Sequence, residues 1–156
     1  MRAPHSLAWA LSGWLAAGCT ASSVGPPTIR YGESACAECR MLINEARYAA
    51  AAFTKANEPV VFDSIECLVR YRHRHGNSLA RMWVHDYGAD RWLSAEEALY
   101  IASPELTTPM GQGVVATASA SEADRLAGAA HGRVLRFAQL AASLGQRTTT
   151  NDPRSP

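Results

Sequence analysis

The motif Cys36-x-x-Cys39-x-Met41 brings two thiols and a thioether together in one short stretch of the chain. Sulfur donors of these types are soft ligands, and among biological metals they select Cu(I) over Mg²⁺, Ca²⁺ or Mn²⁺. In an extended segment, side chains two residues apart point the same way, so Cys39 and Met41 are expected to aim at one point. Cys36 can join them only if the chain turns, and Arg40 is expected to lower the pKa of Cys39. The motif therefore predicts a Cu(I) site built on Cys39 and Met41, with Cys36 as a further candidate ligand.

Other chemistry fits the same cysteines. A disulfide between Cys36 and Cys39, structural or redox-active, has a suitable spacing. A structural zinc site would need all three cysteines of the mature chain and a fourth ligand, for which His73 and His75 are candidates. In either case Met41 would only fill the core. A methionine two residues after a cysteine suits Cu(I), however, and is not a feature of zinc sites.

Cys67 and the residues that follow it are expected to be structural. By a count of 100° per residue, Cys67 lies off the main apolar stripe of a predicted helix, so we expect it to pack against another element as a small hydrophobic side chain. The basic run 70–75 ends the same helix and complements its dipole without acting as a ligand. His85 lies inside a predicted strand and is also expected to be structural.

A second candidate donor, Met110, lies in the glycine-flanked loop 108–113. Glycines permit a close approach of the backbone, so a methionine displayed there would complete a three-sulfur Cu(I) site. The alternative is an ordinary methionine in a turn.

The N-terminus predicts an exported lipoprotein. Arg2 precedes the apolar stretch 7–17, which has about half of the ~20 residues needed to span a bilayer and therefore resembles a signal peptide. Small residues then lead to Cys19, as in a bacterial lipobox, where the cysteine is acylated. We predict a lipoprotein signal peptide over 1–18, a lipid-anchored tether over 19–33 and a position on the periplasmic side of a bacterial membrane, the outer membrane being favoured. Plain secretion is the alternative.

Composition narrows the class of function. The 15 basic and 14 acidic residues give a net charge of +1, which argues against a nucleic-acid partner. The sequence has no nucleophile elbow, HExxH motif, phosphate-binding loop or triad spacing, so an enzyme is not indicated. If Cys19 carries lipid, three thiols remain, and an odd number cannot all pair within one chain.

The body of the chain predicts one domain over 34–144, followed by a disordered tail over 145–156. A capping box from Asp63 to Glu66 begins its first helix. Strand and helix patterns recur in the same order, which predicts an α+β fold of two similar ββαβ-type halves. The alanines of the stretch 47–54 fit a helix as well as a strand. Predicted strands cover 47–54, 60–62, 81–86, 92–93, 99–101, 113–117 and 133–137, and the later helices begin at Ser119 and Ala138.

Together these features resemble the NosL family, the lipoprotein copper chaperones of nitrous oxide reductase maturation. The resemblance runs from the lipobox to Phe137, most of the chain. Its anchors are the motifs Cys36-x-x-Cys39-x-Met41, Phe62-Asp63-Ser64-Ile65-x-Cys67, Trp83-Val84-x-Asp86-Tyr87 and Pro109-Met110-Gly111-x-Gly113.

The resemblance implies a copper-binding domain akin to organomercurial lyase and treble-clef elements. It also implies Cu(I) delivery to the copper centre of nitrous oxide reductase, with the membrane complex NosDFY as a partner. Cys39 and Met41 match the family's copper-binding pair, and Met110 matches a third ligand. The chain departs from the family at Arg40, where glycine is usual, and in its alanine-rich first strand. An exported zinc-binding or disulfide-containing interaction module, with no role in copper transfer, is the alternative function.

Overall fold

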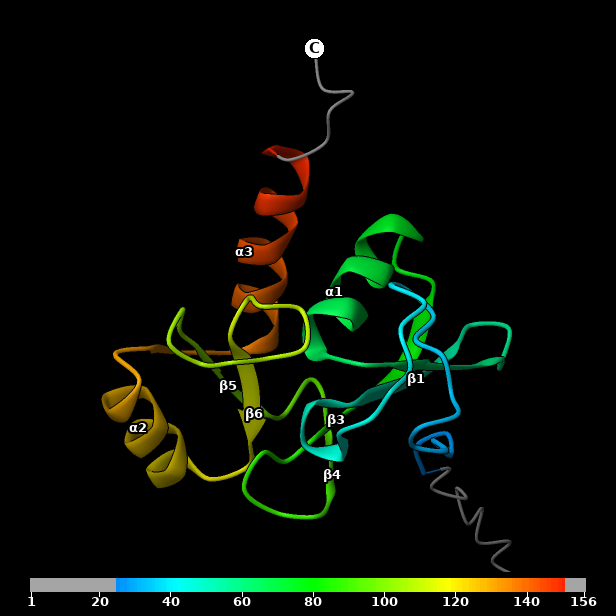
Figure 1. Cartoon of the computed structure of the whole chain (residues 1–156). Coiled ribbons are helices and arrows are strands. Elements are labelled where there is room, and N and C mark those ends of the chain that lie inside the picture. The colour runs from blue at the N-terminus through cyan, green and yellow to red at the C-terminus, as the bar shows by residue number, and fades with distance from the viewer. Residues whose placement is uncertain (1–24, 151–156) are drawn as a thin grey trace, which may run out of the picture.

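The computed structural model describes residues 25–150, and Figure 1 shows their arrangement. A short 3-10 helix, η1 (Ala46–Tyr48), precedes the first sheet. The strands are β1 (Ala50–Thr54), β2 (Pro59–Phe62), β3 (Leu79–His85), β4 (Trp92–Ser94), β5 (Leu99–Ala102), β6 (Val114–Thr117) and β7 (Arg133–Leu135). The helices are α1 (Ile65–Arg74), α2 (Ala120–Ala129) and α3 (Phe137–Thr150).

The strands form two antiparallel sheets, with the orders β2-β1-β3-β4 and β6-β5-β7. Along the chain, β1-β2-α1-β3 and β5-β6-α2-β7 each run strand, strand, helix, strand. The sheets are joined where the chain leaves β3, because the N–H of Tyr87 donates to the carbonyl of Ala116 at 2.8 Å. The α+β class predicted from the sequence is confirmed, whereas the likeness to treble-clef elements and organomercurial lyase stays a prediction.

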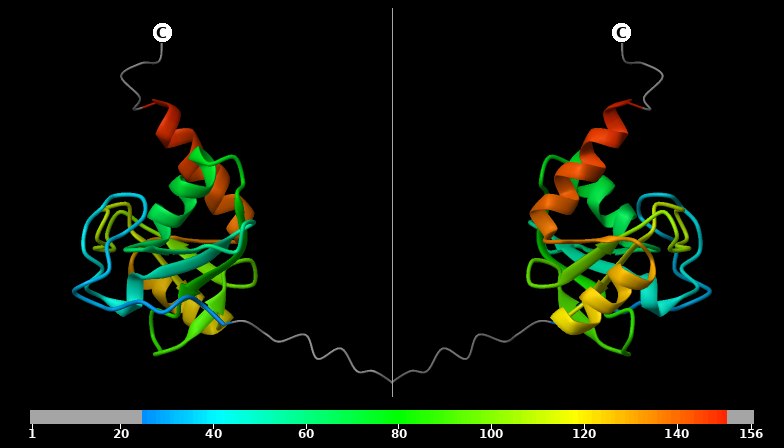
Figure 2. Two further views of the ribbon diagram at one scale, coloured as in Figure 1. Left: turned by 90° about the vertical axis from the view of Figure 1, so that its right-hand side faces the viewer. Right: turned by 90° about the vertical axis from the view of Figure 1, so that its left-hand side faces the viewer.

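One main core spans both sheets. It lies between the first sheet, α1 and α3, and Tyr100 of β5 extends into it from the second sheet. The next residue, Ile101, belongs to a smaller cluster with Ala123 and Leu126 of α2, because successive strand residues point to opposite faces. Helices α1 and α3 lie side by side at one end of the molecule, and α2 lies at the other (Figure 2). β5 is thus buried on both faces.

The alanine run that fitted helix and strand equally well is a central strand. β1 lies between β2 and β3, and Ala50, Ala51 and Ala52 are fully buried. Small side chains let the elements above and below the sheet approach it closely. Pairing on both edges, which is a tertiary effect, decides the conformation here.

The first helix begins one residue later than predicted. Its N-cap is Ser64, whose hydroxyl accepts from the N–H of Cys67 at 3.2 Å, and not Asp63. Glu66 does not complete a capping box, because its carboxylate is fully buried and accepts a hydrogen bond from the hydroxyl of Thr108 at 2.8 Å instead. A partner far away in the sequence has replaced the local one.

The C-terminal prediction also needs correction. We expected a disordered tail over 145–156; α3 continues through Gly145 to Thr150, whereas residues 151–156 lie outside the described residues. Helix α3 packs against α1, and Gly145 itself lies beside His73 of α1.

The N-terminal predictions are mostly untested by the structure. The signal peptide over 1–18, Cys19 and the tether up to residue 24 lie outside the described residues. The end of the predicted tether is part of the fold, since the N–H of Gly32 donates to the carbonyl of Ile43 at 2.8 Å. None of the helices in the described range has the length and apolar character of a membrane span.

The turn after β3 is built around the buried carboxylate of Asp86. Its Oδ2 accepts from Nε and Nη2 of Arg91 at 2.8 and 2.7 Å, and its Oδ1 accepts from the N–H of Gly88 at 3.4 Å. These bonds fix the backbone at the residue that precedes Tyr87. Because Tyr87 pairs with the second sheet, Asp86 supports the junction between the sheets.

We predict that Asp86→Ala lowers the free energy of unfolding by about 2 kcal/mol, because hydrogen bonds to charged groups contribute about 1.5–3 kcal/mol. Chemical denaturation measures the change. The control is Asp90→Ala: its side chain is 99% exposed, so losing its ion pair with His85 should cost less than about 1 kcal/mol. Equal losses for the two variants would contradict this role of Asp86.

Candidate metal centre

Three thiols converge in the first half of the structure. The Sγ atoms of Cys36, Cys39 and Cys67 all lie within 4.8 Å of one another. Cys36 and Cys67 are fully buried, whereas Cys39 is partly exposed. All three are free thiols, so the structure contains no Cys36–Cys39 disulfide. The cluster forms one small group of soft donors with a single side toward solvent.

Cys36 and Cys39 are supplied by a tight loop, residues 35–42, which we call the knuckle. A bridge between Ala35 and Leu42 closes it. Within it, the N–H of Cys36 donates to the carbonyl of Met41 at 2.8 Å, and the N–H of Arg40 donates to the carbonyl of Cys36 at 3.1 Å. The chain therefore turns back on itself, which is the condition under which Cys36 can join Cys39.

Arg40 adopts a left-handed backbone conformation, with φ of 67°. The segment from Cys39 to Met41 is therefore not extended, which corrects the expectation that these two sulfurs point the same way along a strand. A left-handed residue closes the knuckle, and glycine adopts this conformation without the steric cost that a Cβ brings.

Cys67 reaches the cluster from the first turn of α1. The knuckle is fastened to the first sheet by the N–H of Ala37, which donates to the carbonyl of Val61 at 2.9 Å. It is fastened to the end of α1 by an ion pair of 3.3 Å between Glu38 and Arg74. Both attachments hold the two knuckle cysteines against the helix that carries the third.

The cluster favours one thiolate, on Cys36. The Cys67 thiol donates to its sulfur, and backbone N–H groups of Asp63, Cys39 and Glu38 do the same, which together lower the pKa of Cys36 to about 5 against the effect of burial. The same hydrogen bond to Cys36, together with burial, raises the pKa of Cys67. The cluster thus holds a preformed soft anion and two protonated thiols.

The expected effect of Arg40 on Cys39 is wrong. Burial raises the pKa of Cys39, and the charge of the Cys36 thiolate raises it further. Burial and the same thiolate also raise the pKa of Asp63. The cation beside the cluster is instead Arg70, whose Nη2 donates to Cys67 Sγ at 3.8 Å.

The two predicted methionine ligands lie in different surroundings. Met41, on the knuckle, is 51% exposed. Met110 is partly buried against the main core, in a loop that the second half contributes. Their roles as ligands stay predictions.

Cys67 is the member of the cluster that sequence reasoning left out of the Cu(I) site and considered only for the zinc alternative. Its place off the apolar stripe of the helix was the available signal, because a buried cysteine there must face another element. The predicted zinc ligands do not join it: the ring of His75 stacks on Tyr71 at 4.1 Å, and His73 lies near Gly145 of α3.

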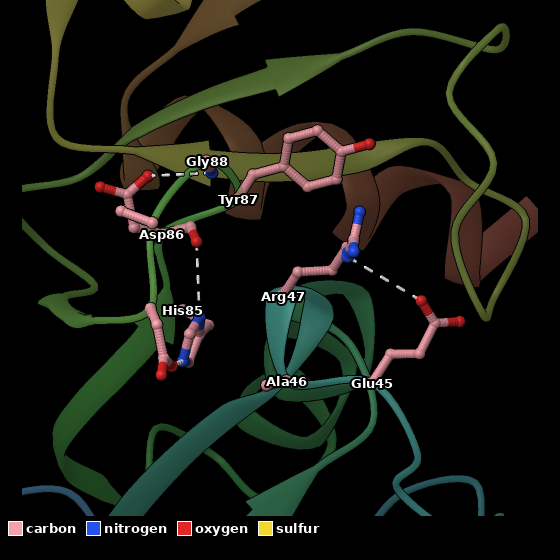
Figure 3. A pocket seen from close by; sticks show the side chains of 9 residues that line it. Glu45, Ala46, Arg47, His85, Asp86, Tyr87 and Gly88 are labelled. Atoms are coloured by element: carbon pink, nitrogen blue, oxygen red, sulfur yellow. Dashed lines mark hydrogen bonds and ion pairs between the residues drawn. The ribbon is translucent and has the colours of Figure 1, made fainter.

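A hollow lies away from the sulfurs, between η1 and the turn after β3 (Figure 3). It has a volume of about 570 Å³. Arg47 lies over the ring of Tyr87, at 5.9 Å from its centroid, and pairs with Glu45. His85 packs edge-on against Trp92, in agreement with its expected structural role. The charged groups lining this hollow already have partners: Arg47 pairs with Glu45, His85 with Asp90, and Asp86 with Arg91.

Comparison with known proteins supports the fold. The model of the NosL family matches residues 28–144. Among solved structures, the crystal structure of the copper chaperone NosL from Shewanella denitrificans is similar, with a TM-score of 0.66 and 20% identity, covering 73% of this chain and 93% of that chain. No curated protein sequence matches.

We predict that Arg40→Gly raises the free energy of unfolding by about 0.5–1 kcal/mol. Removing the Cβ relieves about 1–2 kcal/mol of left-handed strain, and the added freedom of the unfolded chain offsets about half of it. Arg40→Val, which keeps a Cβ and adds a branch, should be destabilising. Denaturation of the metal-free protein measures both, and a less stable glycine variant would refute the assignment of strain.

We also predict that the reduced, metal-free protein keeps one thiolate down to a pH of about 5, visible as ultraviolet thiolate absorbance. Cys36→Ala should remove this titration. Cys67→Ala should raise its midpoint, because the largest stabilising hydrogen bond is lost. A midpoint near the ordinary thiol value of about 8.5 in the original protein would show that Cys36 is not activated.

Proposed function

The chain belongs to the NosL family, and we propose that it is a Cu(I)-binding metallochaperone that holds its cargo on Cys36, Cys39 and Cys67. The observation that carries the proposal is the convergence of three sulfurs within 4.8 Å. Thiolates are the donors that Cu(I) prefers. We assign Cu(I) to the site as cargo, to be loaded and released.

The composition of the cluster favours copper over structural zinc. Structural zinc sites are almost always closed by four ligands in a tetrahedron. Among the residues that the structure describes, no fourth thiol, imidazole or carboxylate joins the three sulfurs. Three thiols leave room for a weaker, exchangeable donor such as a thioether, which suits an ion that must leave again.

We propose that copper leaves past Cys39 and Met41. Cys36 and Cys67 are buried, Cys39 is partly exposed and Met41 is half exposed, so the sulfurs lead from the core to the surface. A thioether is a weaker, neutral soft donor that an incoming ligand can displace. Met41 thus serves as the exchange ligand at the mouth of the site, and Met110 remains a candidate ligand from the second half.

The client and the location follow from the resemblance and from the N-terminal sequence. We propose delivery to nitrous oxide reductase during assembly of its copper centre, with NosDFY as the membrane partner. We propose further that the protein is held on the periplasmic side by acylated Cys19. Family membership supports the first proposal, and the lipobox-like sequence supports the second.

Anaerobic titration tests the copper site. We predict one tightly bound Cu(I) per chain, weakened in Cys67→Ser by more than the 10–100-fold that changes outside the ligand shell cause. The control is Ser78→Ala, which removes a hydroxyl outside the cluster and should leave the affinity unchanged. If Zn²⁺ outcompetes Cu(I), or Cys67→Ser binds copper as well as the original chain does, the proposed site is wrong.

The exchange role of Met41 has its own test. Met41→Ala should slow the transfer of Cu(I) to a competing chelator with little loss of stability, because the side chain is half exposed. The matched control is Leu42→Ala, which truncates a neighbour of equal exposure, at 50%. Equal transfer rates for the two variants would remove Met41 from the release path.

A further inference from the structure

The first turn of α1 carries a second buried group beside the cysteine ligand. Glu66 directly precedes Cys67, and both are fully buried. Successive helix residues are rotated by about 100°, so their side chains leave the helix in different directions. The Cys67 sulfur faces the knuckle, whereas the Glu66 carboxylate meets residues 103–114 of the second half.

Glu66 anchors the loop that carries Met110. Its Oε1 accepts from the hydroxyl of Thr108 at 2.8 Å and from the N–H of Val114 at 3.3 Å. The Thr108 hydroxyl oxygen in turn accepts from the N–H of Gly113 at 3.1 Å. One carboxylate oxygen thus binds both sides of the loop.

The loop is closed on itself as well. The N–H of Ser103 donates to the carbonyl of Gly113 at 2.9 Å. Gly113 has φ of 68°, and a Cβ there would lie 1.7 Å from the Ser103 carbonyl oxygen, so only glycine fits the neck of the loop. The loop is therefore a preformed unit, and Glu66 fixes its position relative to α1.

The carboxylate is a costly choice if folding is its only use. Glu66 Oε2 is buried and has no hydrogen-bond partner among the described residues. Burying a charged group with incomplete hydrogen bonding is unfavourable. The compensation lies at Oε1, which accepts two hydrogen bonds, from the Thr108 hydroxyl and from the N–H of Val114. Glu66 therefore fixes the position of the Met110 loop, while its unpartnered Oε2 lowers the stability of the folded protein.

The anchored loop and the knuckle lie on the same side of the molecule and flank the start of α1 (Figures 1 and 2). Met110 packs against the core cluster that includes Cys36 and Cys67. We propose that Glu66 is a positioning residue of the copper site, which holds the Met110 thioether beside the three thiols. The inference rests on the proposed function, and it makes the second half of the chain part of the site.

The test compares Glu66→Ala, Glu66→Gln and Met110→Ala by anaerobic Cu(I) titration and by the number of sulfur neighbours of copper in X-ray absorption. Glu66→Ala should weaken Cu(I) binding about tenfold, the usual effect of losing an outer-shell partner, and should remove one sulfur neighbour. Met110→Ala should do the same. The double variant should be no weaker than either single variant, because Glu66 acts through Met110.

Rescue separates positioning from a general loss of stability. The amide oxygen of Glu66→Gln can accept the same two hydrogen bonds, so this variant should keep the full sulfur count and an affinity within about twofold of the original. If Glu66→Ala does not fold, Thr108→Val removes the stronger of the two bonds from the loop side and should show the same loss of one sulfur. Unchanged copper binding in Glu66→Ala or Thr108→Val, additive losses in the double variant, or a glutamine variant as weak as alanine would each overturn the inference.

The two proposals fail in different ways. If the original chain binds no Cu(I), or binds it without the cysteines, the proposed function is wrong. If Cys67→Ser abolishes binding while the Glu66 and Met110 variants bind as the original does, the three-thiol site stands and only the role of Glu66 is rejected.

Discussion

The first turn of α1 is the constraint on which the rest of the structure depends. Ser64 caps it, and the next residues send a carboxylate into the second half and a sulfur toward the knuckle. Both side chains are fully buried, so neither can move without opening the core. Two elements far apart in the sequence therefore meet at one helical turn. The thiol cluster and the union of the two halves have the same origin.

Much of the fold could be predicted from local patterns, because short apolar runs, turn residues and helix caps mark most of the elements. The start of α1 could not, since Asp63 and Ser64 are both good caps and only the tertiary structure selects between them. Glu66 does not bond back to the cap, because its carboxylate accepts a hydrogen bond from the hydroxyl of Thr108 in another loop. The errors thus lie where a long-range hydrogen bond replaces a local one.

The candidate site, like the fold, could be predicted only where the signal is local in the sequence. Soft-metal chemistry could be predicted from the spacing of Cys36, Cys39 and Met41, which is local. The third thiol could not, because helical periodicity places Cys67 relative to its own helix and does not say which element covers that face. The lowered pKa of Cys36 depends on a thiol and an N–H from α1 and the residue before its cap. The tendency of Cys36 to form a thiolate therefore depends on tertiary contacts and could not be predicted from the motif alone.

The burial of the sulfurs also bears on how three close thiols resist oxidation. A thiolate reacts with oxidants in proportion to its exposure, and the activated sulfur, Cys36, is fully buried. The accessible thiol, Cys39, is the one whose pKa burial raises, so it is the less reactive of the pair. The more reactive thiol, Cys36, is thus buried, and the thiol that solvent reaches, Cys39, is the less reactive one. That separation protects the empty site from oxidation, and a soft cation, as proposed above, would occupy both sulfurs at once.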